Sequence, residues 1–104
     1  MNAINWAAQN GNLSKVKDLI DSGTAVNTMN YWGETPIHDA CRWGHLEIVK
    51  YLINSGADVD NVNNSGNTPL HLVAIHGNLE IGKFLISFST NINCLNINIF
   101  EGIS

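Results

Sequence analysis

Two sets of apolar residues lie at helical spacing in the middle of the chain. The first set comprises Ile37, Ala40 and Cys41, and the second comprises Leu46, Val49, Leu52 and Ile53. Offsets of three and four residues place each set on one face of a helix. Gly44 follows the first set and Gly56 follows the second, and glycine is favoured just past a helix end because it adopts a positive φ without strain. The pattern predicts two short helices, one ending at each glycine.

The residues before the first of these helices carry the signals of a helix start. Thr35 precedes Pro36. A threonine hydroxyl can accept from the first-turn amides, and the fixed φ of proline suits the first helical position. The sequence therefore predicts that a helix begins at Pro36. Residues 57–66 carry valines among Asp, Asn and Gly, which favours an extended, turn-rich connection.

The same signals return at intervals of 33 residues. Three sets keep this spacing: Gly11, Gly44 and Gly77; Leu13, Leu46 and Leu79; and Leu19, Leu52 and Leu85. The block Gly33-Glu34-Thr35-Pro36-Ile37-His38 recurs as Gly66-Asn67-Thr68-Pro69-Leu70-His71. Helices this short are marginal alone, so successive helix pairs must stack to bury their apolar faces. The periodicity predicts an all-α-dominated repeat protein with one continuous core.

The recurring blocks resemble ankyrin repeats. The similarity extends to Gly44-His45-Leu46-Glu47-Ile48-Val49-Lys50-Tyr51-Leu52-Ile53 and to Gly56-Ala57-Asp58-Val59-Asp60, and it covers roughly residues 3–96. The resemblance implies an ankyrin solenoid of about three helix-turn-helix units with short β-hairpin loops. It also implies that the protein binds other proteins through the hairpin tips and the concave helix face, and that it has no reaction of its own.

Departures from the repeat set the expected boundaries. We expect an ankyrin repeat domain over residues 1–96, with an N-terminal capping repeat (1–30), a second repeat (31–63) and a third (64–96). Residues 97–104 do not restart the pattern, because Ile99 stands where the next glycine belongs. We expect an aborted repeat or irregular tail there, in a truncated form of a longer array or packed against another chain, so that self-association or further repeats would cover this end.

Composition narrows the classes of partner. The 104 residues suffice for one domain, only 13% of them are charged, and the net charge is −4. Nucleic acids and anionic membranes attract clustered Lys and Arg, so both are poor partners for this chain. No apolar run approaches the roughly 18 residues of a membrane span. Two cysteines do not make a disulfide framework, and the expected location is cytoplasmic, with the nucleus as an alternative.

Residues that carry reaction chemistry in other proteins fit structural roles in this pattern. His38 and His71 stand three residues after a threonine, where a histidine can hydrogen-bond the hydroxyl and neighbouring backbone. His38 and Cys41 share one helix face, but tetrahedral zinc takes four ligands and Cys94 has no neighbour at ligand spacing. No phosphate-binding Gly-x-x-x-x-Gly-Lys loop is present. We expect no metal, no cofactor and no enzymatic activity.

Aromatic residues at positions that the repeat should expose give the best functional signal. Tyr31 and Trp32 fall at the hairpin tip of the second unit, and Arg42 and Trp43 at the end of its first helix. Most of their counterparts in the other units are polar, so the fold alone does not require them. Trp, Tyr and Arg are the residues that most often carry interface energy. We predict a partner-binding site at these four residues, with a rim formed by Glu34, Asp39, Asn64, Asn67 and His76.

A structural interpretation competes with this one. The rings of Trp32 and Trp43 could fold back onto neighbouring repeats and serve packing. The third tryptophan, Trp6, aligns with Asp39 and Leu72 in the later units, and we expect it to pack locally in the capping repeat.

The predicted function is a non-catalytic adaptor or scaffold module that binds a partner protein. The alternative is a regulatory or targeting segment of a longer enzyme, such as a kinase, pseudokinase or ubiquitin-ligase subunit. A small inhibitor that plugs the cleft of another enzyme is a third interpretation.

Overall fold

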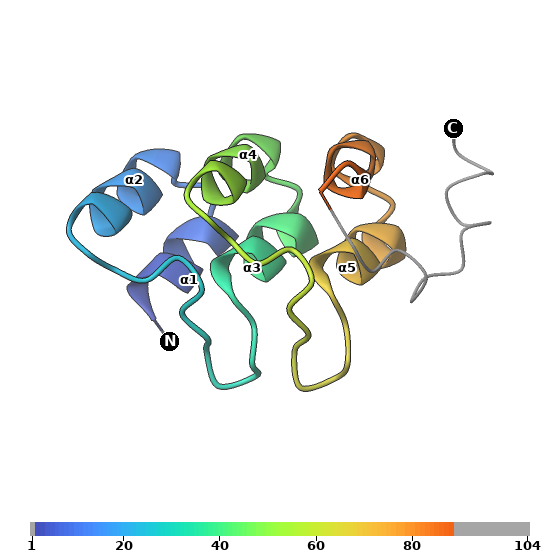
Figure 1. The fold of residues 1–104 in the computed structure, drawn as a ribbon, viewed down its shortest axis with the longest axis horizontal. Coiled ribbons are helices and arrows are strands. Elements are labelled where there is room, and N and C mark those ends of the chain that lie inside the picture. The colour runs from blue at the N-terminus through green and yellow to red at the C-terminus, as the bar shows by residue number, and fades with distance from the viewer. Residues whose placement is uncertain (1, 89–104) are drawn as a thin grey trace.

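The computed structural model describes residues 2–88, and these residues contain six α-helices (Figure 1). The helices are α1 (Ala3–Gln9), α2 (Leu13–Asp21), α3 (Pro36–Trp43), α4 (Leu46–Asn54), α5 (Pro69–His76) and α6 (Leu79–Ile86). As predicted, α3 begins at Pro36 and ends before Gly44, which has a φ of +78°. The all-α repeat fold is confirmed. The predicted tail at 97–104 lies outside the described residues.

The helices form three antiparallel pairs that stand side by side (Figure 1). One row consists of α1, α3 and α5, and a second row of α2, α4 and α6. The loops that lead from α2 to α3 and from α4 to α5 project beyond the first row, on the side away from the second row. Within residues 2–88 these loops contain no β-strand, contrary to the expected hairpins. Each loop tip closes with too few backbone hydrogen bonds to make a ladder.

The predicted cap at the start of α5 is present. The backbone N–H of His71 donates to Thr68 Oγ1 at 3.2 Å, and the N–H of Thr68 donates to Nδ1 of the His71 ring at 3.0 Å. Thr35 N–H donates to His38 Nδ1 in the same way at 3.2 Å. These reciprocal bonds satisfy amides that a helix start leaves unpaired. The structural role predicted for His38 and His71 is confirmed.

The hydrophobic core runs through all three layers, between the two rows of helices. Its members include Ala8, Val16, Ile37, Ala40, Cys41, Ile48, Val49, Leu52, Leu70, Val73, Ile81 and Leu85. Small side chains at Ala8, Ala40 and Cys41 let the first-row helices approach closely, so that neighbouring layers pack directly against each other. None of the helices in residues 2–88 has the length and apolar character needed to cross a membrane.

Trp6 does not pack into the capping repeat as expected, because 55% of its surface is exposed. Its counterparts Asp39 and Leu72 are both buried. Asp39 lies beside Asn5 of the preceding layer, whereas α1 is the first helix of the stack and no earlier layer of the described chain covers Trp6. The ring is exposed because its position faces the open end of the stack.

Polar side chains tie each layer to the next. Since His38 Nδ1 accepts from Thr35, its Nε2 carries the proton and donates to the carbonyl oxygen of Asn67 at 2.9 Å. Asn5 stands in the same repeat position one layer earlier, and its Nδ2 donates to the carbonyl oxygen of Glu34 at 2.9 Å. Two different side chains therefore make the same contact, each to the residue just before a Thr-Pro helix start.

The second row of helices has its own interlayer contacts. Lys17 Nζ lies 5.5 Å from the ring centre of Tyr51, and Lys50 Nζ lies 5.8 Å from that of Phe84. Both distances are within the range of a cation–π attraction. The two lysines occupy the same repeat position, so this outer face repeats one pairing from layer to layer.

Replacing Thr68 tests the cap of α5. We expect Thr68→Ala to lower the free energy of unfolding by about 1 kcal/mol more than Thr68→Ser, because only serine keeps the oxygen that accepts from His71. Urea denaturation followed by circular dichroism measures the difference. Equal losses for the two variants would mean that the hydroxyl bond contributes nothing and that the buried methyl group accounts for the effect.

Candidate functional site

Each loop tip is shaped by one asparagine. Asn30 Oδ1 accepts from the backbone N–H groups of Trp32 and Glu34, both at 3.0 Å, while Gly33 N–H donates to the Asn30 carbonyl at 3.0 Å. These bonds turn the chain tightly and leave the side chains of residues 31 and 32 outside the turn. Tyr31 is 88% exposed and Trp32 is 55% exposed. The predicted exposure of both aromatic rings at the tip is confirmed.

The next loop repeats the same turn. Asn63 Oδ1 accepts from Ser65 N–H at 2.9 Å and from Asn67 N–H at 3.0 Å, and Gly66 N–H donates to the Asn63 carbonyl. Sequence reasoning missed this role of the two asparagines. The signal was available, because Asn30 and Asn63 are one repeat apart and each stands three residues before a glycine.

The two loop tips are hydrogen-bonded to each other. Asn64 N–H donates to the Trp32 carbonyl at 2.9 Å, and Asn64 Nδ2 donates to the Tyr31 carbonyl at 3.2 Å. The close approach depends on Gly33, where an added Cβ would lie 2.5 Å from Asn64 Oδ1 and 3.1 Å from its backbone nitrogen. The tips therefore form one connected surface that holds the backbone of Tyr31 and Trp32 in place.

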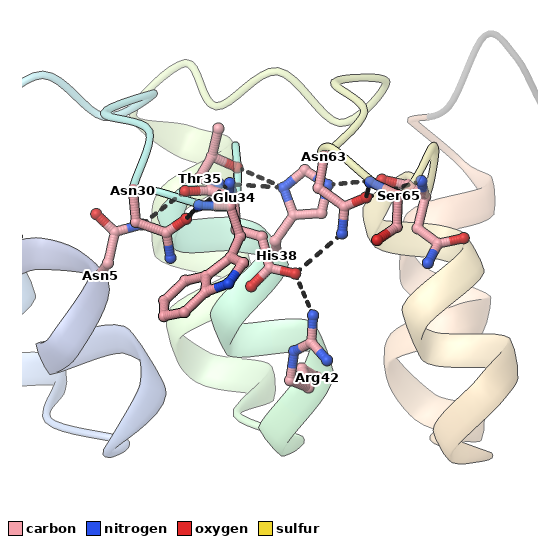
Figure 2. Close-up of polar contacts among 10 residues, drawn as sticks. Asn5, Asn30, Glu34, Thr35, His38, Arg42, Asn63 and Ser65 are labelled. Atoms are coloured by element: carbon pink, nitrogen blue, oxygen red, sulfur yellow. Dashed lines mark hydrogen bonds and ion pairs between the residues drawn. The ribbon is translucent and has the colours of Figure 1, made fainter. Parts of the chain in front are cut away.

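Glu34 lies beneath the tips and connects three layers. Its carboxylate accepts from Asn63 Nδ2 at 2.9 Å and forms an ion pair with Arg42, while its carbonyl accepts from Asn5 (Figure 2). Only 7% of Glu34 is exposed. Glu34 is thus a buried member of the predicted rim, because its carboxylate points inward to partners on α3 and the following loop.

Asp39, also predicted on the rim, is buried with 3% of its surface exposed and does not line the pocket. It lies on the face of α3 that packs toward α1 and Asn5. One of its carboxylate oxygens, Oδ2, is buried without a hydrogen-bond partner. Asp39 is therefore part of the interface between the first and second layers. Leu72 occupies the equivalent position in the third layer.

A pocket of about 360 Å³ lies between the two loop tips. It is lined by Trp32, Glu34, Arg42, Asn63, Asn64, Ser65 and Asn67. Five of the nine predicted partner-binding residues thus meet around one cavity, with Asn63 and Ser65 in addition. Sequence reasoning missed Asn63 because this residue reaches the pocket through a hydrogen bond to Glu34 of the preceding repeat.

Three further predicted residues, Tyr31, Trp43 and His76, do not line the pocket. The Tyr31 ring packs edge-on to Trp32, with 5.9 Å between ring centres. Trp43 ends α3 and is 55% exposed. His76 ends α5 and is exposed, next to the exposed side chain of Ile75. The ends of α3 and α5 thus add uncovered aromatic and apolar surface to the predicted site.

Buried ionisable groups of α3 have shifted pKa values. Burial raises the pKa of Asp39 to about 7, and the Glu34 charge acts in the same direction, while the Asn5 side chain and Arg42 act against them. Burial lowers the pKa of His38, against the hydrogen bond to Asn67. Burial also raises the pKa of the Cys41 thiol. Neutral histidine and thiol groups suit a packed interior, and the described residues contain no cluster of three or more metal-ligating side chains.

A family comparison agrees with this architecture. A model described as ankyrin repeats, in three copies, matches residues 4–96. This chain belongs to the ankyrin-repeat family. Ankyrin repeats are generally protein–protein interaction modules and typically have no catalytic activity of their own. No curated protein matches the chain in sequence. The resemblance inferred from the Thr-Pro blocks is confirmed, while the individual boundaries of the three repeats stay a prediction.

The two loop glycines of this ankyrin domain form a matched pair. Gly33 and Gly66 have φ values of +75° and +81°, but nothing lies within 4 Å of a Cβ added at Gly66. We expect Gly66→Ala to lower the free energy of unfolding by about 1–2 kcal/mol through the left-handed backbone alone. Gly33→Ala should cost more, because its Cβ also pushes Asn64 away. Chemical denaturation of both variants measures the difference, and equal losses would contradict the close contact between the loops.

Asp39→Asn tests the buried carboxyl of α3. The pKa of Asp39 is about 7 in the folded chain and 3.8 as the ordinary value. Between these values the folded chain binds more protons than the unfolded chain, so the Asp39 contribution to stability falls as the pH rises from about 4 to 7. We expect Asp39→Asn to match the native chain near pH 4 and to be more stable at pH 7.5, by on the order of 2–4 kcal/mol.

Comparing the native chain with Asp39→Asn separates the pH dependence caused by Asp39 from the opposite pH dependence caused by His38. Because burial lowers the pKa of His38, the stability that its neutral form contributes is lost as the pH falls below about 6.5. Both proteins contain His38, so its effect cancels in the difference of unfolding free energies. Urea titrations at several pH values measure that difference. A difference that does not change with pH would show that folding does not raise the pKa of this carboxyl.

Proposed function

We propose that this chain is a non-catalytic cytoplasmic adaptor that binds a partner protein through its loop tips and the ends of its first-row helices. The observation that carries the proposal is the exposure of Trp32 on the wall of the pocket between the two tips. Aromatic side chains on a preformed concave surface are typical anchors of protein interfaces. The site is centred on the second repeat, where Tyr31, Arg42 and Trp43 add to Trp32.

The rigidity of the tips supports this role. Backbone and side-chain bonds from Asn30 and Asn64 fix the chain around Trp32 before any partner arrives. Binding to such a preorganised surface loses less conformational entropy than binding to a mobile loop. The backbone that carries Trp32 is therefore held by the loops themselves and not by packing of the indole, which supports a binding role over the competing packing interpretation.

The predicted cytoplasmic location belongs to the same proposal. Its support is the cysteine content: the chain has two cysteines, and Cys41 is a buried free thiol within the core. A reduced thiol in the interior suits a compartment in which disulfides do not form.

Tryptophan replacement tests the proposed site. We expect the double change Trp32→Ala and Trp43→Ala to weaken partner binding by about thirty-fold or more, since a central aromatic contributes about 2 kcal/mol. The partner is obtained by affinity purification with the native chain and then measured as a purified protein by isothermal titration calorimetry. Thermal unfolding of the variant should change little, because both rings are exposed.

Trp6→Ala is the matched control. Trp6 has the same exposed fraction of 55% as Trp32 and Trp43, but it lies on α1 at the open N-terminal end of the stack and does not line the pocket. The Trp6→Ala change removes the same kind of side chain and should leave binding unchanged. Retained affinity in the double variant, or equal loss in the control, would reject the site, and an unfolded double variant would favour the packing interpretation.

A further inference from the structure

We infer that the partner segment that enters the pocket is uncharged there, and that an aromatic or aliphatic side chain packed on Trp32 anchors it. This inference rests on the proposed function and specifies the chemistry of the partner at the same site. It is carried by the distribution of charged side chains over the fold and by the ion pair in the pocket.

Charge is segregated between the two rows of helices. Across residues 2–88, the helices of the second row carry Lys15, Lys17, Asp18, Asp21, Glu47, Lys50, Glu80 and Lys83, and the loop after α4 carries Asp58 and Asp60. The first-row helices and the loop tips carry only Glu34, Asp39 and Arg42 within that range. Of these three, Glu34 and Asp39 are buried. Arg42 is therefore the one accessible charge that the described chain offers a partner on this side.

Arg42 is already compensated. Its guanidinium is paired with Glu34, and the side chains are 32% and 9% exposed respectively. A carboxylate from a partner would have to compete with Glu34 and would face its buried negative charge. A lysine or arginine from a partner would face the Arg42 guanidinium. The pocket therefore disfavours a side chain of either sign, because a buried charge without a partner is costly.

The other groups around the pocket suit a neutral segment. The indole of Trp32 forms an apolar wall, and Asn64, Ser65 and Asn67 contribute amide and hydroxyl groups. Amides and hydroxyls can hydrogen-bond the backbone of an extended segment. Tyr31 is exposed and its ring packs edge-on to that of Trp32, which extends the apolar surface beside the pocket. An uncharged segment with one or two large apolar side chains matches each of these features.

Selection from a phage-displayed library of random linear peptides tests this inference on the full chain. Selected peptides are made synthetically and kept when Trp32→Ala weakens their binding at least about ten-fold. We expect these peptides to share aromatic or aliphatic positions and no required charged residue in an alanine scan. Their dissociation constants should change by less than about two-fold between 50 and 500 mM NaCl, because added salt screens only interactions between charges.

Two variants show that the selection can report charge. Ser65 is exposed on the lip of the pocket, so Ser65→Asp and Ser65→Lys place a single uncompensated charge there without disturbing the core. Peptides selected on Ser65→Asp should gain lysine or arginine, and those selected on Ser65→Lys should gain aspartate or glutamate. Both sets of peptides should bind several-fold more weakly in 500 mM NaCl than in 50 mM NaCl, unlike peptides selected on the native chain.

The outcomes separate this inference from the proposed function. Peptides that depend on Trp32 but require an acidic or basic anchor, with affinity lost at high salt, would overturn the inference and leave the binding site in place. If selection yields no peptide that depends on Trp32 or Trp43, the proposed site fails and the inference fails with it. Peptides that depend on Trp32, contain no required charge and resist salt would support both.

Discussion

A side-chain hydrogen bond from each of α1 and α3 to the backbone of the next layer controls the geometry of this protein. His38 makes this bond to the Asn67 carbonyl, and Asn5 makes it to the Glu34 carbonyl. In each case the acceptor is the residue before the threonine that caps the next helix. The bond therefore fixes where the next helix begins relative to the previous one, and with it the height of the loop tip. Each carbonyl also accepts from a loop backbone N–H, that of Asn30 or Asn63. Without the interlayer bond it is therefore the buried side-chain donor of Asn5 or His38 that would be left unsatisfied, which costs more than a formed bond contributes.

The proposed binding surface is a consequence of this stacking. Because the layers keep a fixed separation, the turn at Asn30 and the turn at Asn63 come close enough for Asn64 to hydrogen-bond the Trp32 carbonyl. The space left beneath the bonded tips is the pocket, and the paired side chains of Glu34 and Arg42 lie at its edge. Core packing, helix capping and the candidate site thus depend on the same register between layers.

The sequence was sufficient for the fold and for the general position of the site. The interval of 33 residues, the Thr-Pro starts and the glycine stops are local signals, and each predicts an element without knowledge of its neighbours. The predicted exposure of Tyr31, Trp32 and Trp43 held because loop tips and helix ends are exposed in any such stack. The burial of Glu34 could not be predicted in this way. It depends on Arg42, near the end of the helix that follows, and on Asn63 in the next layer. The next layer has the apolar Leu72 at the position of Asp39. The charge of Asp39 predicts exposure, and only its contact with the preceding layer shows that Asp39 is buried.

The segregation of charge explains how a chain with so few charges can leave the side of the proposed site nearly free of exposed charge. Only 13% of the residues are charged, yet the second row of helices carries most of them and keeps that face hydrated. Its lysines also cover aromatic surface, as Lys17 does over Tyr51 and Lys50 over Phe84, so their aliphatic stems pack while their charges reach water. The first row is then free of the need to provide solubility. Exposed tryptophans can remain there, where Arg42 is the one accessible charge of the described residues and is paired with Glu34, and an exposed apolar patch with a polar rim is typical of an interaction site.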